Sequence, residues 1–172
     1  DLRLSATVIL QALQGNAKLK KLDLSNNNMS GQAAEDLASV IKSNSNLEQL
    51  GLGGNEFGPF AIAFLQTLKY NSKLKFLNLD NNNMTGQAAE DLASVIKSNS
   101  SLEYLHLKNN KLGSSADIIL KALEGNYKLK TLDLNGNNMT GWISKYLANV
   151  IKSNPGLEEL GLFGNDLRLS AT

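Results

Sequence analysis

The chain has 172 residues, which suits a single domain, and its 17 basic and 16 acidic residues give it a net charge of +1. This balance leaves no electrostatic footprint for nucleic acid or an anionic membrane, and the absence of cysteine excludes disulfides, thiolate metal sites and cysteine nucleophiles. No apolar run approaches the ~18 residues of a membrane span. We therefore expect neither a nucleic-acid nor a membrane partner and, because a chain without cysteine shows no sign of secretion, a cytoplasmic protein.

Residues 1–18 predict the end of a repeat whose strand is missing. Within Ser5–Gln14, four apolar residues fall on one helical stripe: Ala6, Ile9, Leu10 and Leu13. Gly15 and Asn16 then end the helix.

A nine-residue pattern, L-x-x-L-x-L-x-x-N, begins at Leu19 and recurs to the end of the chain. Its later copies begin at Leu47, Leu74, Leu102, Leu129 and Leu157, at alternating spacings of 28 and 27 residues. Inside each copy apolar and polar residues alternate, which predicts a short strand with one buried face, such as Leu19–Leu24. So short a strand needs copies of itself on either side. The period and the leucine spacing are typical of a leucine-rich-repeat array.

A helix is predicted between successive strands. Ser30 is a good N-cap for a helix from about Gly31 to Lys42, and Thr85 and Thr140 repeat this cap. Pro59 suits the first position of a helix. One strand and one helix per repeat predict an α/β solenoid with a parallel sheet inside and helices outside. We expect residues 1–172 to form this single domain, with six strand-containing repeats after the partial one.

Two sets of residues are predicted to be structural. The helix stripe of Phe57, Phe64, Leu65 and Leu68 has the spacing of a hydrophobic core. The ninth position of every pattern is asparagine, whose amide can satisfy backbone groups in the turn after the strand: Asn27, Asn55, Asn82, Asn110, Asn137 and Asn165.

Longer identities overlie the short period. Gly31–Ser45 and Gly86–Ser100 read identically at an offset of 55, and Asp1–Thr7 and Asp166–Thr172 read identically at three times that offset. An array without polar end caps exposes its apolar interior. We therefore expect a fragment of a longer array, or end-to-end self-association through the uncapped termini.

The pattern L-x-x-L-x-L-x-x-N-x-[LMF], followed by a helix that ends near Lys-Ser-Asn, resembles the ribonuclease-inhibitor type of leucine-rich repeat from Leu19 to Leu167. Every repeat carries asparagine where that type alternates with cysteine, which makes the array more similar to those of NOD-like receptors. The resemblance implies a right-handed horseshoe, with the sheet on the concave face and the helices on the convex face. It also implies that the concave face and its edges bind other proteins.

Catalytic groupings are missing from the sequence. His106 is the only histidine, so no triad, acid–base pair or metal cluster has a credible spacing, and we expect no enzyme, no metal and no cofactor. Gly51–Gly54 is only superficially similar to a phosphate loop, because it falls within a predicted strand.

The third, fifth and seventh positions of each pattern are predicted to face the concave side. Adjacent aromatic residues occupy the third position at Phe76 and Tyr104. Because aromatic anchors dominate protein interfaces, we predict a binding site of six residues: Phe76, Asn78, Asp80, Tyr104, His106 and Lys108. The alternative is that these aromatic side chains only pack against one another across neighbouring strands.

Two further features stand outside this site. Trp142 and Tyr146 replace polar residues of the sibling repeats, and we predict a lateral contact such as self-association at this exposed convex spot. The alternative is that Trp142 packs against a neighbouring helix. The second position of each strand alternates in charge, and we predict a structural ladder: Lys20, Glu48, Lys75, Glu103, Lys130 and Glu158.

These features favour a protein-binding scaffold. The first alternative is a GTPase-activating protein similar to the Ran activator, which also uses this fold. The two arginines, Arg3 and Arg168, lie outside the body of the array, which argues against an arginine finger but not against another side chain in that role. The second alternative is a purely structural repeat scaffold.

Overall fold

The computed structural model describes residues 6–16, 18–43 and 46–168. Its strands stack in chain order into one six-stranded sheet in which every neighbouring pair is parallel. The strands are β1 Lys21–Asp23, β2 Gln49–Gly51, β3 Phe76–Asn78, β4 Tyr104–His106, β5 Thr131–Asp133 and β6 Glu159–Gly161. Each has three residues, fewer than the predicted six, but the backbone hydrogen bonds between repeats continue past the strands, as from the Leu24 N–H to the Gly51 carbonyl oxygen at 2.8 Å. The register matches the sequence repeat.

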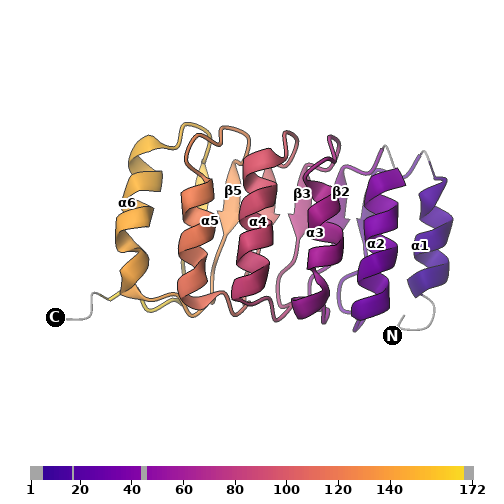
Figure 1. The fold of residues 1–172 in the computed structure, drawn as a ribbon, viewed down its shortest axis with the longest axis horizontal. Coiled ribbons are helices and arrows are strands. Elements are labelled where there is room, and N and C mark those ends of the chain that lie inside the picture. The colour runs from indigo at the N-terminus through magenta and orange to yellow at the C-terminus, as the bar shows by residue number, and fades with distance from the viewer. Residues whose placement is uncertain (1–5, 17, 44–45, 169–172) are drawn as a thin grey trace.

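Helices cover one side of the sheet and lie in a row along it (Figure 1). They are α1 Ala6–Gln14, α2 Gly31–Ser43, α3 Ile62–Leu68, α4 Gly86–Ser98, α5 Ala116–Ala122 and α6 Ser144–Ser153. Short 3₁₀ turns precede three of them: η1 Gly58–Phe60, η2 Gly113–Ser115 and η3 Gly141–Ile143. The predicted α/β solenoid is confirmed. Residues 1–5, which include the predicted helix start at Ser5, and residues 169–172 lie outside the described residues. Both segments belong to the repeated heptapeptide.

The predicted helix starts are right in position but not in mechanism. Thr85 and Thr140 have the extended backbone of an N-cap, yet neither side chain makes a capping hydrogen bond. Both threonines are exposed, so water can satisfy the first N–H groups of these helices instead. Pro59 does lie in the first turn of η1, as predicted.

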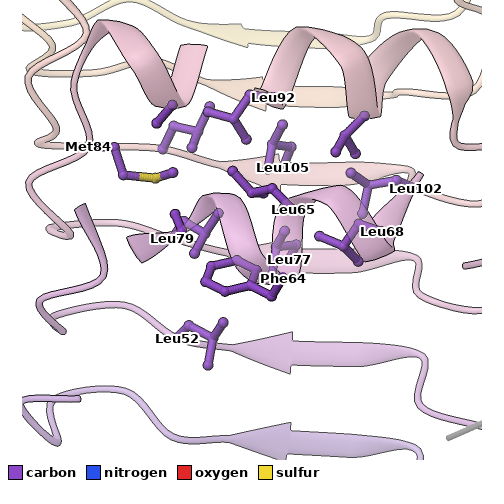
Figure 2. Packing of buried hydrophobic residues seen from close by; sticks show 14 of the residues in the cluster. Leu52, Phe64, Leu65, Leu68, Leu77, Leu79, Met84, Leu92, Leu102 and Leu105 are labelled. Atoms are coloured by element: carbon purple, nitrogen blue, oxygen red, sulfur yellow. The ribbon is translucent and has the colours of Figure 1, made fainter. Parts of the chain in front are cut away.

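The core lies between the sheet and the helices. Leu77 and Leu79 from the sheet side meet Phe64 and Leu65 from α3, and all four side chains are fully buried (Figure 2). Phe57 meets Phe64 edge to face, with ring centroids 5.4 Å apart. Full burial of one such side chain stabilises the fold by about 1.5–3 kcal/mol. The predicted core stripe is confirmed.

The asparagine column ties each repeat to the one before it. The Nδ2 group of Asn110 donates to the carbonyl oxygens of Leu79 at 3.0 Å and Leu107 at 2.8 Å. Its Oδ1 atom accepts from the backbone N–H groups of Asn82 and Met84, each at 3.0 Å. Buried backbone groups that would otherwise be unpaired are thereby satisfied, as predicted. The same four bonds recur at the equivalent asparagines, Asn55 and Asn165.

The intervening asparagines make fewer bonds. Asn137 donates to the carbonyl oxygens of Leu107 and Asn135, but its buried Oδ1 atom has no hydrogen-bond partner. Asn82 accepts a single bond, from the N–H of Phe57 at 3.3 Å. The asparagine column therefore contains two kinds of residue in alternation, one with four hydrogen bonds and one with fewer. This alternation follows that of the 28- and 27-residue spacings.

The helices and the titratable side chains of the described residues fit neither a membrane span nor a metal site. None of the helices found there is both long enough and apolar enough to cross a bilayer. Residues 6–16, 18–43 and 46–168 also hold no group of three or more His, Asp or Glu side chains placed to bind a metal ion.

Candidate functional site

The concave face is the side of the sheet turned away from the helices, and its centre lies on β3 and β4. Parallel pairing sets Phe76 beside Tyr104 and Asn78 beside His106. The ring of Phe76 lies 5.0 Å from that of His106, edge to face, and 6.5 Å from that of Tyr104. We call these three rings the aromatic cluster. The rings therefore do pack against one another across neighbouring strands, an arrangement that is compatible with a binding role as well as with a purely structural one.

Packing leaves the aromatic cluster partly accessible. Tyr104 is 37% exposed, and Phe76 and His106 are half-buried. Along the third-position row, Thr131 on the next strand is buried. The cluster is thus a semi-exposed apolar spot on a face that is otherwise mostly polar.

The polar residues beside the cluster are engaged in the loop that follows the strands. Asn78 Oδ1 accepts from the N–H of Asp80 at 2.8 Å, and Asp80 Oδ1 accepts from the N–H of Lys108 at 2.7 Å. Burial raises the pKa of Asp80, opposed by the bond from Lys108 and by the nearby His106. Asn78 and Asp80 therefore hold backbone N–H groups of the loops in place. The structure brings all six predicted site residues onto two adjacent strands and their loops.

Gly51, the last residue of β2, and Gly54, in the turn after it, are explained by local structure rather than by a phosphate. A Cβ atom on Gly51 would lie 2.5 Å from Asp23 Oδ1, and one on Gly161 would lie 2.7 Å from Asp133 Oδ1. Gly54 has φ +65°, a conformation that L side chains rarely adopt. The missing side chain of Gly51 thus leaves room for the Asp23 carboxylate, and Gly54 allows the left-handed turn conformation.

On the convex side the predicted pair behaves differently at its two positions. Trp142 is 75% exposed, as predicted. Tyr146 is half-buried. The Nζ atoms of Lys121 and Lys145 lie 4.5 Å and 4.8 Å from the centroid of its ring. Hydrogen bonds from Lys145 and, to a smaller extent, from Lys121 lower the pKa of the Tyr146 hydroxyl. The prediction that both positions face solvent was wrong for Tyr146. This helix position faces the preceding helix, and its equivalent in α4, Asp91, is buried too.

A groove between α2 and α3 has no counterpart in the predictions. It has a volume of about 620 Å³ and is lined by residues that include Ile41, Ala63, Thr67 and Tyr70. The position of Ala63 is taken by Ile118 in α5, one double repeat later. The small side chain of Ala63 thus leaves empty on α3 the space that the Ile118 side chain fills on α5. The signal in the sequence is this single alanine.

Arg168, the arginine that lies within the described residues, is already paired. Its Nε and Nη2 atoms donate to the two carboxylate oxygens of Asp166 at 2.7 and 2.8 Å, and these bonds lower the pKa of Asp166 to about 2. The Arg168 side chain remains 89% exposed in this pair.

Comparison with known proteins gives family and fold. A family model described as "Leucine Rich repeat" matches residues 15–38, 70–93 and 98–116, and a second with the same description matches residues 128–150. NACHT, LRR and PYD domains-containing protein 3 is 33% identical in Bos taurus and 37% identical in Homo sapiens, each over 153 residues. Those alignments cover 87% of this chain but only 15% of the relative.

Solved structures with little sequence identity share the fold alone. Leiomodin-1 Actin-Binding Site 2 has a TM-score of 0.67 at 16% identity and covers 84% of this chain and 86% of its own. The tropomodulin C-terminal domain of Caenorhabditis elegans has a TM-score of 0.54 at 15% identity, with coverage of 92% and 81%. Taken with the stacked strands, the leucine core and the asparagine column, these matches show that the chain belongs to the leucine-rich-repeat family and is similar to the repeats of NOD-like receptors.

Proposed function

We propose that the chain is a protein-binding module and that its partner docks on the concave face over the aromatic cluster. The observation that carries this proposal is the contact of Phe76 with Tyr104 and His106 across two strands, with Tyr104 still 37% exposed. Aromatic side chains near the centre of an interface supply most of its binding energy. Repeat solenoids in general bind partners on such extended sheet surfaces.

Rigidity supports the same proposal. The asparagine bonds that join successive repeats fix the strand-to-strand spacing, and Asp80 fixes the loop of the next repeat through the Lys108 N–H. A site already held in its bound shape loses less side-chain and loop freedom on binding. The complementary partner surface has an apolar centre for the three rings and a polar rim for Asn78, Asp80 and Lys108.

The experiment begins with a partner captured on the immobilised chain and then purified, so that its dissociation constant can be measured directly. The double variant Phe76→Ala/Tyr104→Ala should bind about 30-fold more weakly, the equivalent of ~2 kcal/mol for two hot-spot residues. Lys21→Ala and Glu159→Ala are matched controls on outer strands of the same face, and both residues are exposed. Circular dichroism must show that the double variant is folded. An affinity equal to that of the controls would remove the site from the aromatic cluster.

We also propose that this module is non-catalytic and acts in the cytoplasm. The lack of arginine in the body of the array, between Arg3 and Arg168, supports the first point against the GTPase-activating alternative. Adding the purified chain to a panel of GTPases should leave their rates of GTP hydrolysis unchanged, and stimulation of any one would favour that alternative. Cell fractionation with an antibody to the chain tests the second point.

A further inference from the structure

The groove between α2 and α3 owes its shape to α3, because its other wall recurs unchanged in the array. α2 and α3 are neighbours in the row of helices (Figure 1), and α2 has the same sequence as α4. The α3 wall differs from its equivalent one double repeat later, where Ile118 replaces Ala63 and Gly125 replaces Tyr70. The junction of α2 and α3 therefore combines an open space beside Ala63 with a Tyr70 ring that is 88% exposed.

Hydrogen bonds hold the two walls of the groove in place. The Asn71 Nδ2 group donates to the Ile41 carbonyl oxygen of α2 at 3.1 Å. Its Oδ1 atom accepts from the N–H groups of Lys73 and Leu74, at 2.9 and 2.8 Å. The bond to Ile41 also covers one of the carbonyl groups that the end of α2 leaves without an intrahelical partner, which would otherwise repel an anion. The groove is thus formed before any ligand arrives.

Positive charge lines the groove. Lys42, in the last turn of α2, and Lys73, in the turn after α3, are both exposed lining residues. Neither forms an ion pair within the part of the chain that the structure describes. The chain also has no acidic residue between Glu56 and Asp80, a stretch that includes all of α3.

The equivalent of Lys73 at the junction of α4 and α5 is already engaged. It is Lys128, whose Nζ atom lies 5.2 Å from the centroid of the Tyr127 ring. At the groove that position next to the lysine is Ser72, which offers no ring. Lys73 is therefore available to a ligand in a way that Lys128 is not.

We propose that the groove binds a small aromatic anion, such as an aromatic carboxylate or sulfonate. Its ring fills the space beside Ala63 and packs against Tyr70, and its acid group lies between Lys42 and Lys73. The volume of about 620 Å³ is in the range of small-molecule sites, which are mostly apolar and carry a few polar groups that fix orientation. This site is on the helical side of the molecule, so it is separate from the aromatic cluster and adds a second ligand to the proposed protein partner.

Fluorescence titration of the 172-residue chain with anilinonaphthalenesulfonate tests the proposal. This probe is an aromatic anion whose emission rises in an apolar site. The wild type should bind one probe molecule per chain, and Ala63→Ile should raise the dissociation constant about tenfold or more, because isoleucine fills the space of the ring. Ala148→Ile, at an exposed position of α6, is the matched control and should bind like the wild type. Unchanged affinity in Ala63→Ile would overturn the proposal.

The charge requirement is tested with a matched pair of double variants. Lys42→Ala/Lys73→Ala should bind the probe about tenfold more weakly, whereas Lys97→Ala/Lys128→Ala, which changes the equivalent lysines one double repeat later, should not. Both double variants should bind phenylnaphthylamine, the uncharged analogue of the probe, as the wild type does. The wild type should bind this analogue less tightly than the sulfonate. Equal affinity for the two probes would contradict the selection of an anion.

One further variant separates the groove from the concave face. Phe76→Ala/Tyr104→Ala, which removes two rings of the aromatic cluster, should bind the probe with the affinity of the wild type. Loss of probe binding in this variant would place the probe on the concave face and overturn the proposal. Circular dichroism of every variant shows whether it is folded, because a partly unfolded chain would also bind the probe.

Discussion

The side-chain amide of Asn110 donates to the carbonyl oxygen of Leu79, a residue 31 positions earlier in the chain, at 3.0 Å. This bond joins two successive repeats at the point where each strand turns outward. Because the same connection recurs along the array, the concave face is held in shape by buried amides as much as by leucines.

Asn110→Ala should destabilise the fold more than Asn137→Ala. Both residues are buried, but Asn110 accepts from two backbone N–H groups, whereas Asn137 Oδ1 has no partner. Each buried group left unsatisfied costs about 1–3 kcal/mol, so we expect a difference of ~2 kcal/mol or more between the two variants. Urea unfolding of both variants measures it. Equal losses would mean that the two columns contribute alike.

Asp91→Asn should stabilise the protein at pH 7. Burial raises the pKa of Asp91, and its Oδ2 atom has no hydrogen-bond partner. A carboxyl with a raised pKa in the folded state binds a proton more readily there than in the unfolded state. Its contribution to stability is therefore present below its unfolded pKa and is lost as the pH rises through its folded value.

The gain from Asp91→Asn should accordingly shrink as the pH falls toward 4, near the pKa of an unfolded aspartate, which is about 3.9. Asp36→Asn is the matched control in the identical sequence of α2. Asp36 accepts a bond from the Thr7 hydroxyl at 2.6 Å, so its replacement should not stabilise the fold. Melting temperatures between pH 4 and 7 measure both variants. A gain that is constant across this range would contradict the assignment to ionised Asp91.

Glu103→Lys should lower thermal stability at low salt. The carboxylate pairs with Lys130 at 2.7 Å and raises the pKa of that lysine, and its replacement would place three lysines in a row. Because the pairs are partly exposed, the loss of stability should be small, and salt should screen it. Glu124→Lys, at an exposed site off the column, is the control. Melting curves that are unchanged at low salt would refute the ladder.

Ala63→Ile should close the groove between α2 and α3 and raise the melting temperature. The equivalent residue in α5 is Ile118, which packs against the core. Each newly buried methylene group is worth about 0.8 kcal/mol, and incomplete burial here reduces the gain to ~1 kcal/mol in all. Ile118→Ala should produce the opposite change. Destabilisation by Ala63→Ile would show that the groove is too narrow for the side chain.

The sequence was sufficient for the repeat, the strand register and the core, because a fixed leucine spacing forces equivalent residues into equivalent places. Phe64, Leu65 and the asparagine column follow directly from that periodicity. It was insufficient wherever a position depends on its neighbour in space. Tyr146 was predicted to face solvent from its polar siblings, but that position faces the preceding helix, and even Asp91 is buried there. The missing threonine caps and the groove beside Ala63 likewise depend on local helix geometry, which periodicity does not specify.

The candidate site was predictable to the same extent. Adjacent third positions placed Phe76 and Tyr104 on neighbouring strands, and the structure confirms that they meet. The edge-to-face contact of Phe76 with His106 and the use of Asp80 to hold the Lys108 backbone depend on side-chain conformations. The alternation of buried and outward positions in the sequence does not predict these two contacts.

The central claim, that a protein partner docks over the aromatic cluster, is tested most directly by site-specific photo-crosslinking with the purified partner. One chain carries the photoreactive phenylalanine derivative benzoylphenylalanine in place of Tyr104, and a second carries it in place of Tyr70, which is 88% exposed beside the groove of α2 and α3. We predict a covalent product with the partner from position 104 and none from position 70. A product from position 70 alone would contradict the account and place the partner on the helical side.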